Sequence, residues 1–184
     1  MSSSRMKMMK MSEQEMMNLW KLRTGIMPLR QECTIEREDG IDVEFLSFLD
    51  MREWYANLLK EAPIDWLPCR EMKDELSLKV GTDNVGCISL PEGCIRPVRI
   101  KLASWQRGIE QFWEATTPVA MLQENNYSRG NAANPVIITE SQALRLYVCS
   151  GAEERIENAM CIAYPKDGSY EFAELALSTI PKKI

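Results

Sequence analysis

Carboxylate side chains are the residues of this sequence that can support catalysis without a cofactor. They form three groups, namely Glu36, Glu38 and Asp39; Asp74 and Glu75; and Glu153, Glu154 and Glu157. Paired carboxylates act as acid and base in glycoside hydrolysis and as metal ligands in nucleases. Each group lies in a stretch with the composition of a polar loop, and such charge clusters are usually solvated. The pattern therefore favours a solvated face over a catalytic pair.

Histidine is absent from the 184 residues, which excludes every mechanism that uses imidazole as a general base, proton shuttle or metal ligand. The nine glycines form neither a GxGxxG nor a GxxxxGK[ST] loop, so the two phosphate-binding loops most easily recognised in a sequence are missing. We therefore expect a protein that is not an enzyme and that binds no cofactor.

The six cysteines are scattered and include no CxxC pair. A zinc site would need four distant thiolates, because no histidine can complete it. The alternative is that Cys87, Cys149 and Cys161, which have β-branched or aromatic neighbours, are small buried hydrophobes of a reduced protein. We favour this alternative and predict no metal.

The densest cationic stretch of the chain contains Arg96, Arg99, Lys101, Trp105 and Arg107. A tryptophan flanked by arginines can stack on the bases of single-stranded nucleic acid. The alternative is a strand with a charged outer face and a tryptophan in the core. Because 27 acidic residues against 22 basic ones give a net charge of -5, the alternative is favoured.

The composition is that of a globular protein, with 45% hydrophobic residues and a mean hydropathy of -0.28, and we expect no membrane partner. Two helices are predicted, over residues 13–24 and 43–60. Ser12 and Glu15 match a capping box and Gly25 supplies a stop, while Asp42 can cap the second helix and Pro63 prevents its continuation. The following Trp66-Leu67-Pro68 is expected to plug the core under a turn.

Residues 85–164 have the alternating pattern of β-strands. Two strands on either side of Pro91-Glu92-Gly93 predict a hairpin, and three short strands over 136–139, 144–149 and 156–164 predict an antiparallel meander. The pattern of residues 104–113 fits a further strand and a short helix equally well. Residues 170–179 are compatible with one more helix. The polar segment 118–135 is predicted to be a long loop. Its part from Gln123 to Asn134 is predicted to hold a defined shape by local hydrogen bonds of its asparagines, with Gly130 able to take a positive φ, so that Tyr127 and Arg129 project as interface anchors.

The fold class expected is α+β, with N-terminal helices followed by an antiparallel β-meander, extended arms and a short C-terminal tail. Residues 1–11 alternate methionines with Arg5, Lys7 and Lys10 and predict a flexible basic arm, whose interrupted apolar run does not fit a secretory signal. Residues 12–184 are predicted to form a single domain.

Two blocks of the chain resemble one family. The run 90–107, LPEGCIRPVRIKLASWQR, has a proline-acidic turn, a strand and a tryptophan with a basic neighbour, as in the ring or adaptor proteins of the neck in crAss-like podoviruses. The loop 123–130, closed by 134–136 and followed by Leu144-Arg145-Leu146-Tyr147, is similar to the next block of those proteins. The resemblance implies a structural virion protein, made in the host cytoplasm, that forms a head-to-tail adaptor ring joining portal to tail.

By this resemblance the partners are other copies in a homo-oligomeric ring, with a dodecamer as one candidate, together with the portal and other neck or tail proteins. DNA would only pass through the lumen. A closed ring needs two different patches that fit each other, and the narrow stripe of the first helix needs a partner surface. The candidate interface residues are Met16, Leu19, Trp20, Arg23, Arg96, Trp105, Arg107, Tyr127 and Arg129. The alternative function is a non-enzymatic cytoplasmic module that binds or inhibits a host protein.

Overall fold

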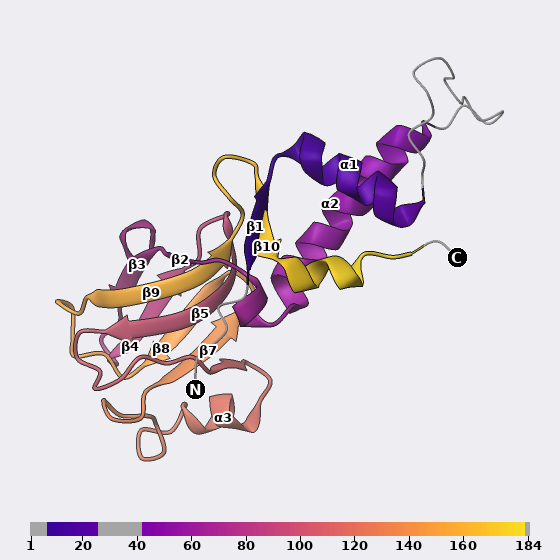
Figure 1. Ribbon diagram of the computed structural model, residues 1–184. Coiled ribbons are helices and arrows are strands. Elements are labelled where there is room, and N and C mark those ends of the chain that lie inside the picture. Colours follow the sequence, from indigo (N-terminus) through magenta and orange to yellow (C-terminus); the bar gives the residue numbers. More distant parts are fainter. Residues whose placement is uncertain (1–6, 26–41, 183–184) are drawn as a thin grey trace, which may run out of the picture. The chain divides into compact units, whose positions relative to one another are not determined.

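The computed structural model describes residues 7–25 and 42–182 and has an α+β fold (Figure 1). The chain divides into two compact units, and the expectation of a single domain over 12–184 is therefore not met. Unit 1 combines the chain up to Pro68 with the chain from Tyr164 onward, and unit 2 is Cys69–Ala163. Within the described ranges, no helix has both the length and the apolar character that a membrane crossing requires.

The described residues of unit 1 form two α-helices and a two-stranded antiparallel ribbon. The Ser12 hydroxyl accepts from the Glu15 amide at 3.3 Å, and the Glu15 carboxylate accepts from the Ser12 amide at 2.8 Å, so the predicted capping box is confirmed. Gly25 ends the helix with a φ of 71°. The elements are β1 (Met8–Met11), α1 (Glu13–Thr24), α2 (Val43–Glu61), the 3-10 turn η1 (Ile64–Trp66), β10 (Tyr170–Ala173) and the 3-10 helix η3 (Glu174–Thr179).

The predicted flexible arm is wrong for Met8–Met11, which pair with β10 from Met8↔Ala173 to Met11↔Tyr170. Met9 and Met11 are half-buried, while the ammonium of Lys10 pairs with Asp167 at 2.6 Å. Met8 and Lys10 are exposed, so accessibility alternates along β1 as in a half-buried strand. The helix considered for 170–179 is also corrected, because β10 occupies its first four residues and η3 the remainder.

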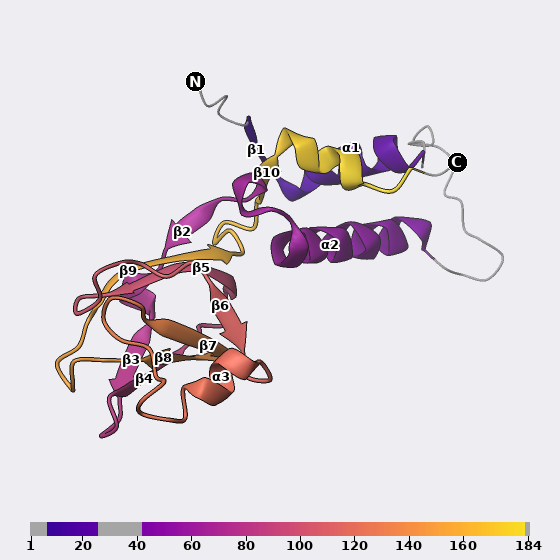
Figure 2. The same cartoon turned by 90° about the horizontal axis from the view of Figure 1, so that it is seen from below.

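Unit 2 is built from two β-sheets in two layers, which Figure 2 shows from below. The three-stranded sheet has the order β2-β9-β5, and the five-stranded sheet has the order β3-β4-β8-β7-β6. All pairs are antiparallel except β6 with β7. The elements are β2 (Cys69–Glu71), the 3-10 turn η2 (Lys73–Glu75), β3 (Ser77–Val80), β4 (Val85–Ser89), β5 (Cys94–Leu102), β6 (Phe112–Glu114), α3 (Pro118–Leu122), β7 (Val136–Glu140), β8 (Ala143–Tyr147) and β9 (Ile156–Ala163).

One apolar core lies between the two layers. Ile88, Leu144 and Leu146 of the larger sheet and Ile100 and Leu102 of the smaller sheet are all fully buried in it. The predicted hairpin is wrong, because β4 pairs with β3 and β8 whereas β5 pairs with β9. The predicted meander is correct only for β7 and β8, since β9 belongs to the other sheet. In both places the connecting segment crosses from one layer to the other, so the two strands that it joins lie on opposite sides of the core.

Candidate functional site

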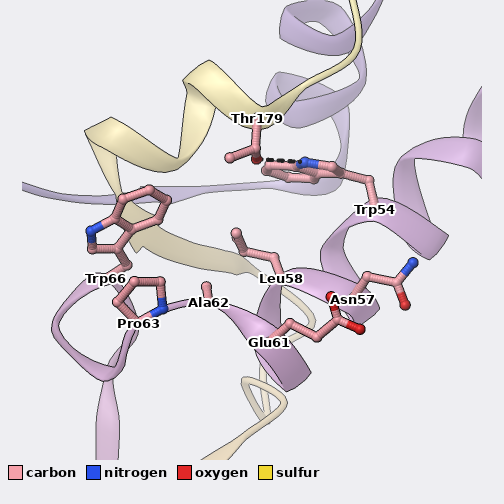
Figure 3. A pocket seen from close by; sticks show the side chains of 8 residues that line it. All are labelled: Trp54, Asn57, Leu58, Glu61, Ala62, Pro63, Trp66 and Thr179. Atoms are coloured by element: carbon pink, nitrogen blue, oxygen red, sulfur yellow. Dashed lines mark hydrogen bonds between the residues drawn. The ribbon is translucent and has the colours of Figure 1, made fainter.

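A pocket of about 290 Å³ lies in unit 1 between the C-terminal half of α2, η1 and η3 (Figure 3). The rings of Trp54 and Trp66 stand on opposite sides of it, and Leu58 and Ala62 lie between them. The pocket exists because Pro63 ends α2 and turns the chain back, so that η1 returns Trp66 beside the helix it has just left. The lining residues are Trp54, Asn57, Leu58, Glu61, Ala62, Pro63, Trp66 and Thr179.

The orientation of Trp54 is fixed on several sides. Its indole N–H donates to the Thr179 hydroxyl at 3.0 Å, and its ring lies 5.9 Å from that of Trp20 and 5.5 Å from that of Phe172. The Phe172 contact is edge to face, an arrangement that the aromatic quadrupole favours. The indole that lines the pocket is therefore preorganised.

A second surface feature of unit 1 is an exposed apolar face on the first two turns of α2. Phe45, Leu46 and Leu49 are 57%, 41% and 44% exposed. The apolar periodicity of this helix predicts burial for all three, but the buried stripe is narrower and runs through Met51, Tyr55 and other positions further along the helix. We refer to Phe45, Leu46 and Leu49 as the α2 apolar face.

A third feature is an apolar patch on unit 2. Met121 and Leu122 of α3 are 65% and 54% exposed, and Tyr127 in the following loop is fully exposed. The prediction that this loop holds a defined shape by local hydrogen bonds agrees with the structure, because the Asn125 carboxamide accepts from the Tyr127 amide at 2.9 Å. We refer to Met121, Leu122 and Tyr127 as the α3 apolar patch.

Three of the nine predicted interface residues are core residues of their own unit. Met16, Trp20 and Trp105 are 0%, 3% and 2% exposed. The Trp105 indole N–H donates to the Val148 carbonyl at 2.7 Å, which contradicts its use as a stacking platform for nucleic acid. These three residues cannot contact a neighbouring chain without local unfolding.

The other predicted interface residues differ in accessibility. Arg107 is exposed and its guanidinium donates to the Asn134 carboxamide at 3.0 Å, while Arg23 is half-buried and donates to the Leu177 carbonyl at 3.4 Å. Leu19 and Arg96 are also half-buried. Only Tyr127 and Arg107 are thus fully available on the surface.

Arg129 does not project beside Tyr127 as expected. Its guanidinium donates to the carbonyls of Gln123 at 2.8 Å and Asp83 at 3.2 Å, and it lies 5.5 Å from the centre of the Tyr147 ring. Gly130 next to it does not have a positive φ. A Cβ at Gly130 would lie 2.9 Å from the Asn134 carbonyl oxygen, so glycine is needed for a close approach of two backbones.

The carboxylate groups of the sequence have different surroundings. The first group, Glu36, Glu38 and Asp39, lies outside the described residues. Asp74 and Glu75 are exposed in η2, as predicted for a solvated face. Glu154 is the exception, because it is 8% exposed and accepts hydrogen bonds from the amides and hydroxyls of both Ser104 and Ser150.

The cysteines also lie in different places. Cys149 and Cys161 are buried as predicted, and burial raises the pKa of the Cys149 thiol to about 11. Cys87 is exposed on β4, which contradicts its predicted burial, and Cys33 lies outside the described residues. In the part of the chain that the structure describes, no three His, Cys, Asp or Glu side chains come together as a metal site would require.

Comparison of the chain with protein-family models, curated proteins and solved structures finds no match. The site is therefore interpreted from its own residues. Sequence reasoning missed the pocket between Trp54 and Trp66, for which the one available signal was a tryptophan on each side of the helix end at Pro63.

Proposed function

We propose that this chain is a non-catalytic structural subunit that assembles into a ring in the neck of a bacteriophage virion. There it would join the portal to the tail and let DNA pass through its lumen. The proposal combines the resemblance of residues 90–107 to neck ring proteins with the exposed apolar surfaces of the two units. It also fits a net charge of -5, because an acidic lumen repels the phosphates of passing DNA.

The α2 apolar face carries the proposal. Exposing apolar surface costs roughly 25 cal/mol per Å² relative to burying it. Adjacent large apolar side chains on the surface of a globular protein therefore often mark a binding site for another chain. Phe45 and Leu49 are one helical turn apart and Leu46 lies beside them, so they can enter a single groove together.

The α3 apolar patch supplies the second half that a closed ring needs. A cyclic ring is held by heterologous contacts, in which one patch of a subunit fits a different patch of the next subunit. The α2 apolar face and the α3 apolar patch are different in sequence and lie on different units. They therefore fit the requirement, and they replace the buried residues Met16, Trp20 and Trp105 as candidate contacts.

The test is the particle mass of the purified protein as a function of concentration, with negative-stain electron microscopy of any large species. The paired substitutions Phe45→Glu with Leu49→Glu, and Met121→Glu with Leu122→Glu, should each abolish the ring without changing the circular dichroism spectrum. Leu175→Glu is the matched control, because Leu175 is 54% exposed outside both patches. A protein that stays monomeric at every concentration and is missing from virions would contradict the proposal.

The α2 apolar face also fits the alternative function, a cytoplasmic module that binds or inhibits a host protein. In that case the chain stays monomeric and captures one host protein in a stoichiometric complex. The Phe45→Glu and Leu49→Glu pair should then abolish capture, whereas the α3 pair should leave it intact. The two functions are thus distinguished by whether one patch or both are needed.

A further inference from the structure

The pocket between Trp54 and Trp66 has few polar groups available to a ligand. The Thr179 hydroxyl accepts from Trp54 and donates to the Ala176 carbonyl at 2.7 Å, so its one O–H donor is not available to a ligand. The Trp54 N–H is committed to the same hydroxyl, and Figure 3 shows the Trp66 nitrogen turned away from Trp54. The polar side chains left at the rim are Asn57 and Glu61, one turn apart on α2.

Glu61 gives the pocket its charge preference. Among the described residues that line it, Glu61 is the sole charged one, and its side chain is exposed at the mouth. An anionic ligand would be repelled by this carboxylate. A purely apolar ligand would cover it without offering a partner, which costs free energy. The electrostatics therefore favour a cation.

The two indole rings favour a particular kind of cation. A cation near the face of a tryptophan is attracted by the ring quadrupole, and tryptophan is the strongest of the aromatic side chains in this respect. A planar guanidinium is less strongly hydrated than an ammonium, stacks on aromatic faces and offers several N–H donors to a carboxylate. A volume of about 290 Å³ suits one long side chain better than a large cofactor.

We propose that this pocket binds the side chain of an arginine presented by a partner polypeptide. The guanidinium enters the space lined by Trp54 and Trp66, the Glu61 carboxylate of the lining is its acceptor, and the aliphatic stem covers Leu58 and Ala62. Because Trp54 is held by Thr179, Trp20 and Phe172 before the ligand arrives, little side-chain ordering is needed on binding. This binding mode does not depend on assembly into a ring.

The test uses the full chain and the peptide Ac-Gly-Gly-Arg-Gly-Gly-NH₂, followed by the NMR signals of the indole N–H groups. Saturable shifts of the Trp54 and Trp66 signals are expected. A citrulline peptide, which has the same shape without the charge, and the variant Glu61→Gln should each weaken binding about tenfold. Glu53→Gln is the matched control, because Glu53 is an exposed acid of α2 that does not line the pocket, and it should change nothing.

Three results would overturn the proposal. The first is equal affinity for the arginine and citrulline peptides, and the second is tighter binding of a proline-rich peptide, which also docks on aromatic grooves. The third is an arginine peptide that causes no saturable shift at millimolar concentration. Glu61→Gln alters one exposed side chain, so a loss of binding in this variant reports on the carboxylate and not on the fold.

Discussion

The buried carboxylate of Glu154 holds Ser104, which lies fifty residues earlier in the chain, by accepting from both its amide, at 3.2 Å, and its hydroxyl. The same carboxylate accepts from the amide of Ser150 at 2.8 Å. One side chain thus joins the end of β5 to the turn before β9 in unit 2. The hydrogen bonds that Glu154 accepts from described residues come from unit 2, so they hold parts of that unit together.

Glu154→Gln should destabilise unit 2, because the amide that replaces one carboxylate oxygen cannot accept from the donors that face it. Leaving such buried donors without an acceptor costs roughly 1–3 kcal/mol. Urea unfolding at pH 7 measures the change, and Glu153→Gln, an exposed neighbour, is the control. Equal stability of the two variants would show that the hydrogen bonds of Glu154 contribute nothing net.

The same carboxylate predicts a pH dependence. Burial by itself raises the pKa of Glu154, but the hydrogen bonds from Ser104 and Ser150 together outweigh it and hold the pKa below its ordinary value of 4.5. A carboxylate with a lowered folded-state pKa contributes stability that is complete above pH 4.5 and is lost as pH falls through the folded-state pKa. The stability difference between wild type and Glu154→Gln should therefore shrink on acidification below pH 4.5. A difference that grows on acidification would contradict this assignment.

Arg129 and Tyr127 should respond oppositely to alanine substitution. Arg129→Ala removes two hydrogen bonds to carbonyls and the contact with the Tyr147 ring, and should cost roughly 1–3 kcal/mol. Tyr127→Ala changes a fully exposed side chain and should alter stability by less than about 0.5 kcal/mol. Thermal unfolding of both variants tests the pair. If Arg129→Ala is neutral, the loop is not held by this side chain.

Gly130→Ala should destabilise unit 2, because the added Cβ would lie 2.9 Å from the Asn134 carbonyl oxygen and 3.2 Å from the Val136 amide nitrogen. Backbone atoms cannot yield as a flexible side chain can, so a cost of roughly 1–3 kcal/mol is expected. Gly93→Ala, where a Cβ would meet no atom within 4 Å, is the matched control and should be close to neutral. The measurement is urea unfolding of both variants.

The backbone amides of β1 and β10 should exchange slowly with solvent deuterium in the isolated protein, because the two strands pair over four residues and Phe172 of β10 is fully buried. Deleting residues 1–11 should destabilise unit 1 by roughly 1–3 kcal/mol through the lost ladder. Rapid removal of these residues by protease, with no change in the melting temperature, would instead support the flexible arm that the sequence suggests.

The two α-helices of unit 1 were predictable from the sequence because their signals are local. The Ser12 and Glu15 capping box and the stop at Pro63 act within a few residues, and the structure places the helix ends within one residue of the predicted ones. Strand pairing was not predictable in the same way. The turn at Pro91-Glu92-Gly93 is compatible with a hairpin and with a connection between the two sheets. Which of the two forms is decided by contacts in the core, such as the packing of Ile88 in the cluster between the sheets.

The residues of the candidate site were also not predictable where their surroundings depend on tertiary contacts. Trp105 and Arg129 have the residue types of interface anchors, yet their partners, the Val148 carbonyl and the Tyr147 ring, belong to segments distant in sequence. Conversely, Phe45 and Leu49 have the spacing of buried helix positions and are exposed. Residue type and hydrophobic periodicity predict which interactions a side chain is able to make. The tertiary fold determines which face of a helix or loop is buried and therefore which of these interactions form.

The division of the chain also fixes an order of events during synthesis. All of unit 2 emerges from the ribosome before β10, so unit 2 can fold while the chain is still growing. The first and last strands of unit 2, β2 and β9, pair with each other, with Cys69 opposite Ile162. Unit 2 is therefore an insert between the two parts of unit 1 that can fold by itself. Unit 1 must wait, with β1 and α2 already made, until β10 and η3 arrive to cover Trp54 and Tyr55. Translation pauses in the codons after Ala163 should therefore prolong the time during which unit 1 exposes its aromatic residues to chaperones.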